Sequence, residues 1–192
     1  VTFTVSGGGC TQTTTQNIVV NPTPTASFSS TAPQCTGTGV DFTNTGTSSG
    51  VSYLWNFGAG ATPATSTDQN PVGVTYSSSG TKTVTLVVTD TLSGCSATAS
   101  TTININQTPV ASFTSTAPQC SSVAIDFTNT GSTGGSWSYS WNFGQGANPA
   151  GSSAESPTGI MYSSGGTKTV TLTVSGAGCT QTSTQTIDIG AT

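Results

Sequence analysis

Apolar and polar residues alternate along most of this chain, which is the pattern of strands that bury one face and expose the other. In TKTVTLVV (81–88), Val84, Leu86 and Val88 share one face and threonines occupy the opposite one. Threonine is β-branched and fits a pleated, half-buried surface, so its abundance favours strands. Further strands are predicted by the alternation around Ala26 and Phe28, Val40 and Phe42, Tyr53, Trp55 and Phe57, GVTY (73–76), and Ala97, Ala99, Ile103 and Ile105. No stretch has a helical period of useful length, so we expect an all-β protein.

Long phrases of the sequence recur, which indicates internal repeats of about 85 residues. The matching pairs are TASFSSTAPQC (25–35) with VASFTSTAPQC (110–120), SYLWNFGAG (52–60) with SYSWNFGQG (138–146), and SSGTKTVTLVV (78–88) with SGGTKTVTLTV (164–174). The first residues, VTFTVSGGGCTQTTTQNIVV (1–20), match VTLTVSGAGCTQTSTQTIDI (170–189). We therefore expect the last strands of a preceding repeat at 1–22 and complete repeats at 23–107 and 108–192. We also expect the chain to be cut from a longer array.

Each complete repeat carries about seven predicted antiparallel strands with turn residues roughly every 8–12 positions, a pattern typical of an immunoglobulin-like β-sandwich. NPTPT (21–25) and NQTPV (106–110) separate the repeats. Short joints that contain proline are stiff rather than flexible. The expected fold class is therefore a row of tandem immunoglobulin-like sandwiches.

Three short motifs lie in the first complete repeat and have counterparts in the second: W-N-F-G (55–58), N-P-V-G-V-T-Y (70–76) and G-T-K-T-V-T-L-V-V-T-D (80–90). They resemble the phrases W-D-F-G-D-G, N-P-x-H-x-Y and G-x-Y-x-V-x-L-x-V of the PKD domain family. The resemblance implies that the motif tryptophan is the core pin of each sandwich. The core motif then comprises Trp55, Phe57, Tyr76, Trp141, Phe143 and Tyr162. The style of the repeats is also similar to large bacterial surface adhesins of the Bacteroidetes type.

The charge content excludes several classes of function. The chain has two lysines or arginines, no histidine and six acidic residues, and charged residues make up 4% of it. No basic run and no long apolar run is present, so we expect neither nucleic-acid binding nor membrane insertion. Without histidine, a Ser-His-Asp or Cys-His arrangement is impossible. The carboxylates are scattered, and Asn56, Ala59, Asn142 and Gln145 replace the acids of the PKD loop motif, which disfavours calcium. We expect no enzyme, no cofactor and no metal site.

Two further features raise hypotheses. Lys82 recurs in the second repeat together with Asp41 and Asn44, a set of residue types that can form an intramolecular isopeptide bond. The simpler interpretation is an exposed lysine near an acid, which contributes little. Trp137 has no counterpart in the first repeat, where Val51 aligns, and we expect it to be exposed and to contact a neighbour.

Five cysteines fall at two positions of the repeat. Cys35 and Cys120 precede the second strand, whereas Cys10, Cys95 and Cys179 follow the fifth. Regular spacing in a threonine-rich chain of low charge favours disulfides over free thiols, and no CxxC pair indicates a metal site. Three schemes fit: Cys35–Cys95 with Cys120–Cys179 inside each repeat, Cys10–Cys35 with Cys95–Cys120 across the joint, or Cys35–Cys179 with the following repeat.

The positions of the cysteines at the two ends of the sandwich favour the pairing Cys35–Cys179. The first and last hairpins lie at opposite ends, and a strand of about seven residues separates them by roughly 23 Å. This exceeds the limit of about 7 Å between the Cα atoms of a disulfide. The first hairpin instead faces the last hairpin of the next repeat, which leaves Cys10, Cys95 and Cys120 for repeats outside this chain. A Cys35 loop folded back along the sandwich would keep the other schemes open.

These observations predict a mechanical function, a structural repeat segment of an extracellular surface fibre, stalk or adhesin that gives length and stiffness. The expected location is the bacterial cell surface or the secreted fraction. The expected partners are adjacent repeats, other copies packed side by side, and glycans. Thr91 is a candidate O-glycosylation site because Asp90-Thr91-Leu92 resembles a short acceptor motif, whereas Asn106-Gln107-Thr108 fits an N-glycosylation sequon best read as chance. The alternative function is a polysaccharide-binding accessory module of a secreted enzyme, which predicts an exposed aromatic row.

Overall fold

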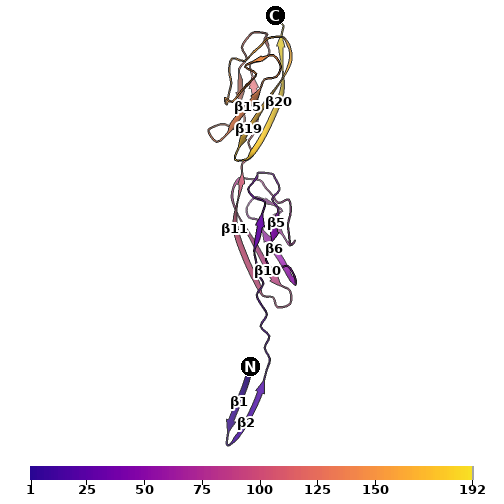
Figure 1. The fold of residues 1–192 in the computed structure, drawn as a ribbon, viewed down its shortest axis with the longest axis vertical. Coiled ribbons are helices and arrows are strands. Elements are labelled where there is room, and N and C mark those ends of the chain that lie inside the picture. Colours follow the sequence, from indigo (N-terminus) through magenta and orange to yellow (C-terminus); the bar gives the residue numbers. More distant parts are fainter. Residues whose placement is uncertain (192) are drawn as a thin grey trace.

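The computed structural model describes residues 1–191, which form strands and loops. Figure 1 shows an elongated array with a hairpin at one end, two sandwiches in line after it, and the C-terminus at the far end. Thr192, the last residue of the expected second repeat, lies outside the described residues. Across 1–191 there is no helix long and apolar enough to cross a membrane.

The N-terminal hairpin has the sequence of the last two strands of a sandwich. It pairs β1 (Thr2–Gly7) with β2 (Cys10–Thr15), and residues 16–27 continue as chain without strands. Phe3 is 63% exposed, whereas Leu172, which takes the same place in the last hairpin, is fully buried. The apolar face of this hairpin is therefore the face that the rest of a sandwich would cover.

The first complete repeat is a sandwich of nine strand segments. They are β3 (Phe28–Ser30), β4 (Gln34–Cys35), β5 (Phe42–Asn44), β6 (Val51–Asn56), β7 (Ala61–Thr62), β8 (Thr65–Ser66), β9 (Thr75–Tyr76), β10 (Gly80–Asp90) and β11 (Ser96–Asn106). One sheet has the order β4-β11-β10-β6-β8, and the pairs β3–β5 and β7–β9 form the other layer.

The second complete repeat copies this plan. Its strands are β12 (Phe113–Ser115), β13 (Gln119–Cys120), β14 (Phe127–Asn129), β15 (Ser138–Asn142), β16 (Ala147–Asn148), β17 (Gly151–Ser152), β18 (Met161–Tyr162), β19 (Gly166–Gly176) and β20 (Cys179–Gly190). Its main sheet has the order β13-β20-β19-β15-β17. In Figure 1, β11 runs along one side of the first sandwich and β20 along the opposite side of the second.

The tandem all-β, immunoglobulin-like class is confirmed, but the division into strands differs from about seven short ones. β10 and β11 each have 11 residues and form one long hairpin. Proline separates two pairs of short strands: Pro33 lies between β3 and β4, and Pro63 lies between β7 and β8. Proline has no amide hydrogen to donate to a ladder, so a strand ends where it occurs. One pair, β4 with β11, is parallel.

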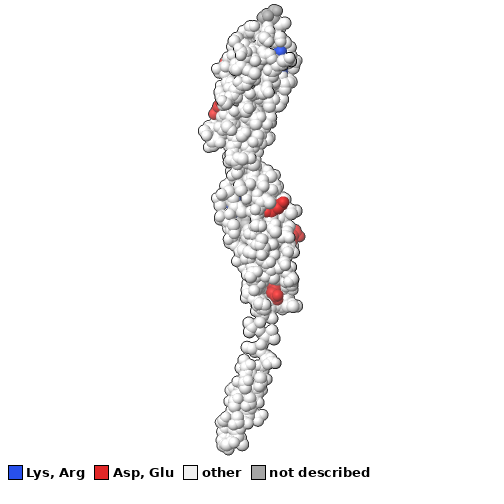
Figure 2. All heavy atoms as spheres, viewed as in Figure 1, with Lys and Arg blue, Asp and Glu red and all other residues white. Residues whose placement is uncertain are grey.

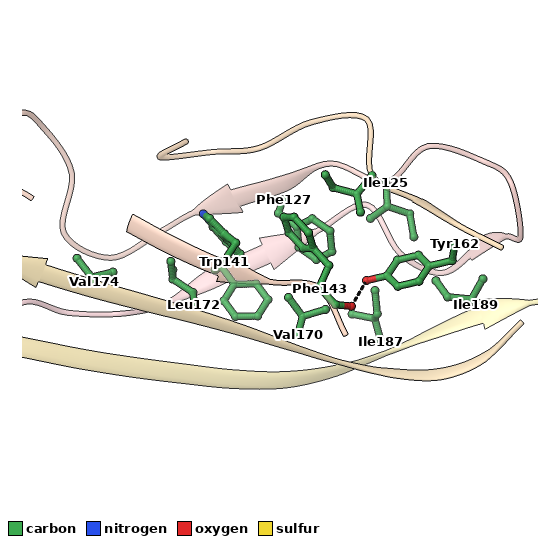
Figure 3. Packing of buried hydrophobic residues seen from close by; sticks show 12 residues of the cluster. Ile125, Phe127, Trp141, Phe143, Tyr162, Val170, Leu172, Val174, Ile187 and Ile189 are labelled. Carbon is green, nitrogen blue, oxygen red and sulfur yellow. Dashed lines mark hydrogen bonds between the residues drawn. The ribbon is translucent and has the colours of Figure 1, made fainter. Parts of the chain in front are cut away.

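The core of each repeat is built around the motif tryptophan, as the PKD resemblance implied. The six residues of the core motif are between 0% and 3% exposed. Trp55 packs against Phe28 and Phe57 with ring centroids 5.1 and 5.9 Å apart. Figure 3 shows the same cluster in the second repeat, with Trp141 beside Phe143. The indole N–H of Trp55 donates to the Asp68 carbonyl at 2.8 Å, so a side chain of this size is buried without an unpaired polar atom.

A buried tyrosine closes the same core at its other end. The Tyr76 hydroxyl donates to the Phe57 carbonyl at 2.9 Å, and the Tyr162 hydroxyl donates to the Phe143 carbonyl at 2.7 Å (Figure 3). Burial raises the pKa of both tyrosines to about 12. The tyrosine therefore ties the W-N-F-G loop to the strand that carries the N-P-x-x-x-x-Y motif.

Replacing Tyr76 with Phe should lower the free energy of unfolding of the first repeat by about 1–3 kcal/mol, because the Phe57 carbonyl is left unpaired in the core. The pH dependence should change too. The unfolded chain loses the phenol proton at the ordinary pKa of 10.0 while the folded chain keeps it to about 12. This share of stability is complete below pH 10 and is lost as pH rises through 12.

Urea unfolding at pH 8 and across pH 9–12 checks both effects. Tyr76→Phe with Tyr162→Phe should remove the contribution of these two phenols to the alkaline loss. An unchanged alkaline loss in this double variant would show that other groups cause it.

Candidate functional site: the joint between the repeats

The acids that recur in both repeats have structural roles. The Asp41 carboxylate accepts the Gly73 amide at 2.7 Å, and the Asp126 carboxylate accepts the Gly159 amide at 2.8 Å. Each pair fixes the loop that precedes the motif tyrosine. The surface of residues 1–191 has no detected pocket and no group of three His, Cys, Asp or Glu side chains placed to hold a metal ion.

The two lysines are buried, not exposed as the simpler interpretation of the sequence held. Lys82 is 7% exposed and Lys168 is 9% exposed. The Lys82 ammonium donates to the Ser78 hydroxyl at 2.9 Å and lies 5.9 Å from the centre of the Tyr76 ring. The Asn44 amide is engaged elsewhere, where it donates to the Thr47 carbonyl at 3.0 Å. Lys82 and Asn44 therefore have different hydrogen-bond partners, a hydroxyl for the lysine and a backbone carbonyl for the asparagine.

One disulfide spans the joint between the complete repeats. Cys35 and Cys179 are bonded, with their Cα atoms 5.9 Å apart and a separation of 144 positions in the sequence. Cys35 lies in β4 of the first repeat, and Cys179 begins β20 of the second. The pairing that the sandwich ends favoured is confirmed.

Strand pairing explains why the pairings inside a repeat do not form. β4 pairs in parallel with the end of β11, so that Cys35 lies opposite Asn106. Cys95 lies just before the start of β11, and a strand of eleven residues is roughly 36 Å long. The two cysteines are therefore at opposite ends of the sandwich.

The remaining cysteines form no disulfide within residues 1–191. Cys10 and Cys120 are exposed, and Cys95 is half-buried. Cys120 lies opposite Gly190 at the end of β20, just as Cys35 lies opposite Asn106 at the end of β11. That their partners lie in neighbouring repeats stays a prediction.

Hydrogen bonds join the repeats beside the disulfide. The Asn106 side chain donates to the Ala177 carbonyl at 2.7 Å, which connects the end of β11 to the next hairpin turn. The connecting segment is itself held to the first repeat. The Thr108 amide donates to the Thr36 hydroxyl at 3.1 Å, and the Thr108 hydroxyl donates to the Thr36 carbonyl at 2.9 Å. These bonds restrain the segment that connects the two repeats.

Sequence reasoning did not predict that Asn106 bonds to the next repeat, and it interpreted this residue only as part of a chance sequon. A signal was present, because Asn21 follows Cys10 and Asn106 follows Cys95 at the same spacing. The contact between Thr36 and Thr108 had no such signal, since it depends on how the connecting segment lies on β4.

Trp137 packs against the tip of the β19–β20 hairpin, which contains both Cys179 of the disulfide and Ala177 of the Asn106 hydrogen bond. Ala177 and Gly178 have φ angles of 49° and 81°, those of a tight two-residue turn. Trp137 covers the neighbouring Gly176, where a Cβ atom would lie 2.5 Å from the indole Cε3. Trp137 is half-buried against its own core, so the expectation of an exposed side chain that contacts a neighbour was wrong. It supports the joint from within the second repeat.

Comparison with protein families identifies the repeats. The sequence model of the PKD domain matches residues 21–105 and 106–190. The chain belongs to the PKD domain family. A search of curated proteins finds no match to the chain.

Several solved structures are similar to the chain over most of its length. The fibronectin(III)-like modules of Clostridium thermocellum CbhA match 86% of this chain and 95% of theirs, with 10% identity and a TM-score of 0.39. The I67–I69 fragment of titin matches 90% of this chain and 67% of its own, with 10% identity and a TM-score of 0.43. Three domains of the bacteriophage RB49 capsid protein Hoc match 88% of this chain and 59% of theirs, with 14% identity and a TM-score of 0.35.

The first PKD repeat has a different hairpin tip from the second. The Asp90 carboxylate accepts the amides of Ser93 and Leu92 at 2.7 and 3.1 Å, and the Ser93 amide is the main cause that lowers the pKa of Asp90. The Thr91 hydroxyl donates to the Gly50 carbonyl at 3.0 Å. Thr91 is therefore on an exposed, ordered turn, and its glycosylation stays a prediction.

Gly176→Ala should destabilise the second PKD repeat by about 1–3 kcal/mol, because the added methyl overlaps the Trp137 ring and the Ser136 carbonyl oxygen. Adding Trp137→Val, the residue that the first repeat has in this place, should relieve the overlap and recover part of the loss. Urea unfolding of the oxidised chain measures both. Gly7→Ala is the matched control, since a Cβ atom there meets nothing within 4 Å. Equal losses at Gly7 and Gly176 would contradict the role of Trp137.

Proposed function

We propose that this chain is a structural segment of an extracellular surface fibre, stalk or adhesin and that it supplies length and stiffness. The observation that carries the proposal is the Cys35–Cys179 disulfide, which joins one PKD repeat to the next and not one strand to another within a repeat. A bond in that place links two cores across the joint. Its effect is to fix the angle between neighbours.

The joint resists bending because three connections cross it. The backbone crosses it once, the disulfide crosses it from β4, and Asn106 crosses it to the turn at Ala177. A hinge needs free torsions in its connecting residues, and the bonds of Thr108 with Thr36 restrict them at this joint. Each repeat then adds roughly 35–45 Å to a rod of nearly constant direction.

The disulfide also bears on location. Disulfides form and persist in oxidising compartments and are rare in the cytosol. PKD domains with a disulfide between repeats suit an extracellular setting, and the bacterial cell surface or the secreted fraction is the location we propose. The likeness to adhesins of the Bacteroidetes type rests on sequence style alone.

A polysaccharide-binding accessory module has less support. Such a module needs aromatic rings on the outside, but Trp55 and Trp141 are 0% and 3% exposed in the two cores. Trp137 is half-buried over Gly176. Within residues 1–191, the aromatic ring exposed most is Phe3, on the hairpin face that corresponds to a core.

Loss of the disulfide should loosen the rod without unfolding it. In Cys35→Ser with Cys179→Ser, residual dipolar couplings should no longer fit one common alignment for both repeats, and small-angle scattering should show a broader and shorter distance distribution. The oxidised parent should fit one rigid arrangement. Cys120→Ser is the matched control, because this thiol forms no disulfide in the chain. Identical rigidity with and without the disulfide would overturn the mechanical role.

A further inference from the structure

The outward face of the second repeat's main sheet is a grid of hydroxyl and amide side chains. Its rows, read across β15, β19 and β20, are Ser138, Ser175 and Thr180; Ser140, Thr173 and Thr182; and Asn142, Thr171 and Thr184. Two cross-strand pairs, Thr171 with Thr184 and Thr173 with Thr182, have hydroxyl oxygens 3.2 Å apart. Several hydroxyls of this face are thus already paired with each other.

The corresponding face of the first repeat differs in its middle row. We call it the outer face of the first repeat. Its rows, read across β6, β10 and β11, are Ser52, Thr89 and Ser96; Leu54, Val87 and Thr98; and Asn56, Thr85 and Ser100. Leu54 is 53% exposed and Val87 is half-buried beside it. An apolar spot thus lies against a rim of hydroxyl and amide side chains, at the place where the second repeat has Ser140 and Thr173.

We propose that the outer face of the first repeat is a lateral docking surface and that its occupant is the same face of a second copy of the chain. This inference rests on the proposed function, because it states how rods of this protein associate side by side. The two faces meet about a twofold axis, so that the Leu54 and Val87 pairs of the two copies cover each other and the rims meet rim to rim.

The chemistry of the face favours a second copy over another partner. None of its nine side chains is charged, so two copies meet without like-charge repulsion, and a charged partner finds no counterpart. Hydroxyls both donate and accept, and a hydroxyl rim is therefore complementary to itself. No aromatic ring is present to stack on a sugar.

The rest of the surface also allows close approach. The two lysines are buried, and the acids are scattered along the array. Figure 2 shows few charged atoms among white ones on the visible face. The net charge of −4 over the whole chain is too small to hold two rods apart at physiological salt.

The size of the face predicts weak pairing by a single chain. Five residues on each of three strands cover about 250 Å², against about 800 Å² per partner in a standard interface. One pair of faces therefore binds weakly. Association becomes stronger only where further repeats that carry such an apolar spot engage along the same two rods, because each further contact is then intramolecular.

The test is a concentration series of amide NMR spectra of the oxidised 192-residue chain, from micromolar to millimolar. The expected result is concentration-dependent shifts confined to β6, β10 and the start of β11. Leu54→Ser with Val87→Thr gives the first repeat the residues of the second, so its fold should persist. The apparent dissociation constant should rise by roughly tenfold, because the buried apolar area is lost.

The reverse change is the matched gain-of-function variant. Ser140→Leu with Thr173→Val should create concentration-dependent shifts on β15 and β19 of the second repeat. Shifts that persist in Leu54→Ser with Val87→Thr, or that map to the apolar face of β1 and β2, would overturn the proposal. The absence of any concentration dependence would overturn it as well.

Adding a soluble β-glucan to the dilute chain tests whether the face binds a polysaccharide and not a second copy of the chain. Shifts of the same residues with glucan, without any change on concentration alone, would assign the face to a polysaccharide and overturn the pairing of copies. The rod itself is judged separately by the Cys35→Ser with Cys179→Ser comparison. A stiff rod without lateral shifts would defeat this inference and leave the proposed function intact.

Discussion

Cys35 and Asn106 lie side by side because β4 pairs in parallel with the last residues of β11. This short pairing places one thiol and one amide at the downstream end of the first repeat, where both reach the hairpin tip of the second. The length of β11 keeps Cys95 at the other end and so prevents closure within the repeat. The use of the cysteines, the stiffness of the joint and the mechanical proposal all depend on these few backbone hydrogen bonds.

The two repeats share one fold but differ in the turn of their last hairpin. The second repeat uses a two-residue turn that needs Gly176 and the cover of Trp137. The first uses a longer turn that Asp90 closes through the amides of Leu92 and Ser93. Both tips are rigid, although one is held by packing and the other by a carboxylate. The outer faces of the two repeats also differ, because Leu54 and Val87 of the first repeat correspond to Ser140 and Thr173 of the second.

Alternation and repetition in the sequence were enough to predict the class, the two repeats and the buried motif residues, because inward positions of a strand are set by local pattern. The Cys35–Cys179 pairing followed from which end of a sandwich each cysteine occupies. The length of β10 and β11 was underestimated, because threonine-rich outward positions carry no signal for where a strand ends. Trp137 and Asn106 were misread because their partners, Gly176 and Ala177, become neighbours only after the hairpin and the joint have formed.

The disulfide also changes the route that tension takes through the molecule. When the two ends are pulled apart, force enters along the first residues, crosses from Cys35 to Cys179 through sulfur and leaves along β20. The segment between the two cysteines forms a closed covalent loop that carries no tension. That loop holds most of both cores, including Trp55 and Trp141. A protease cut anywhere inside it would leave the ends of the chain covalently connected.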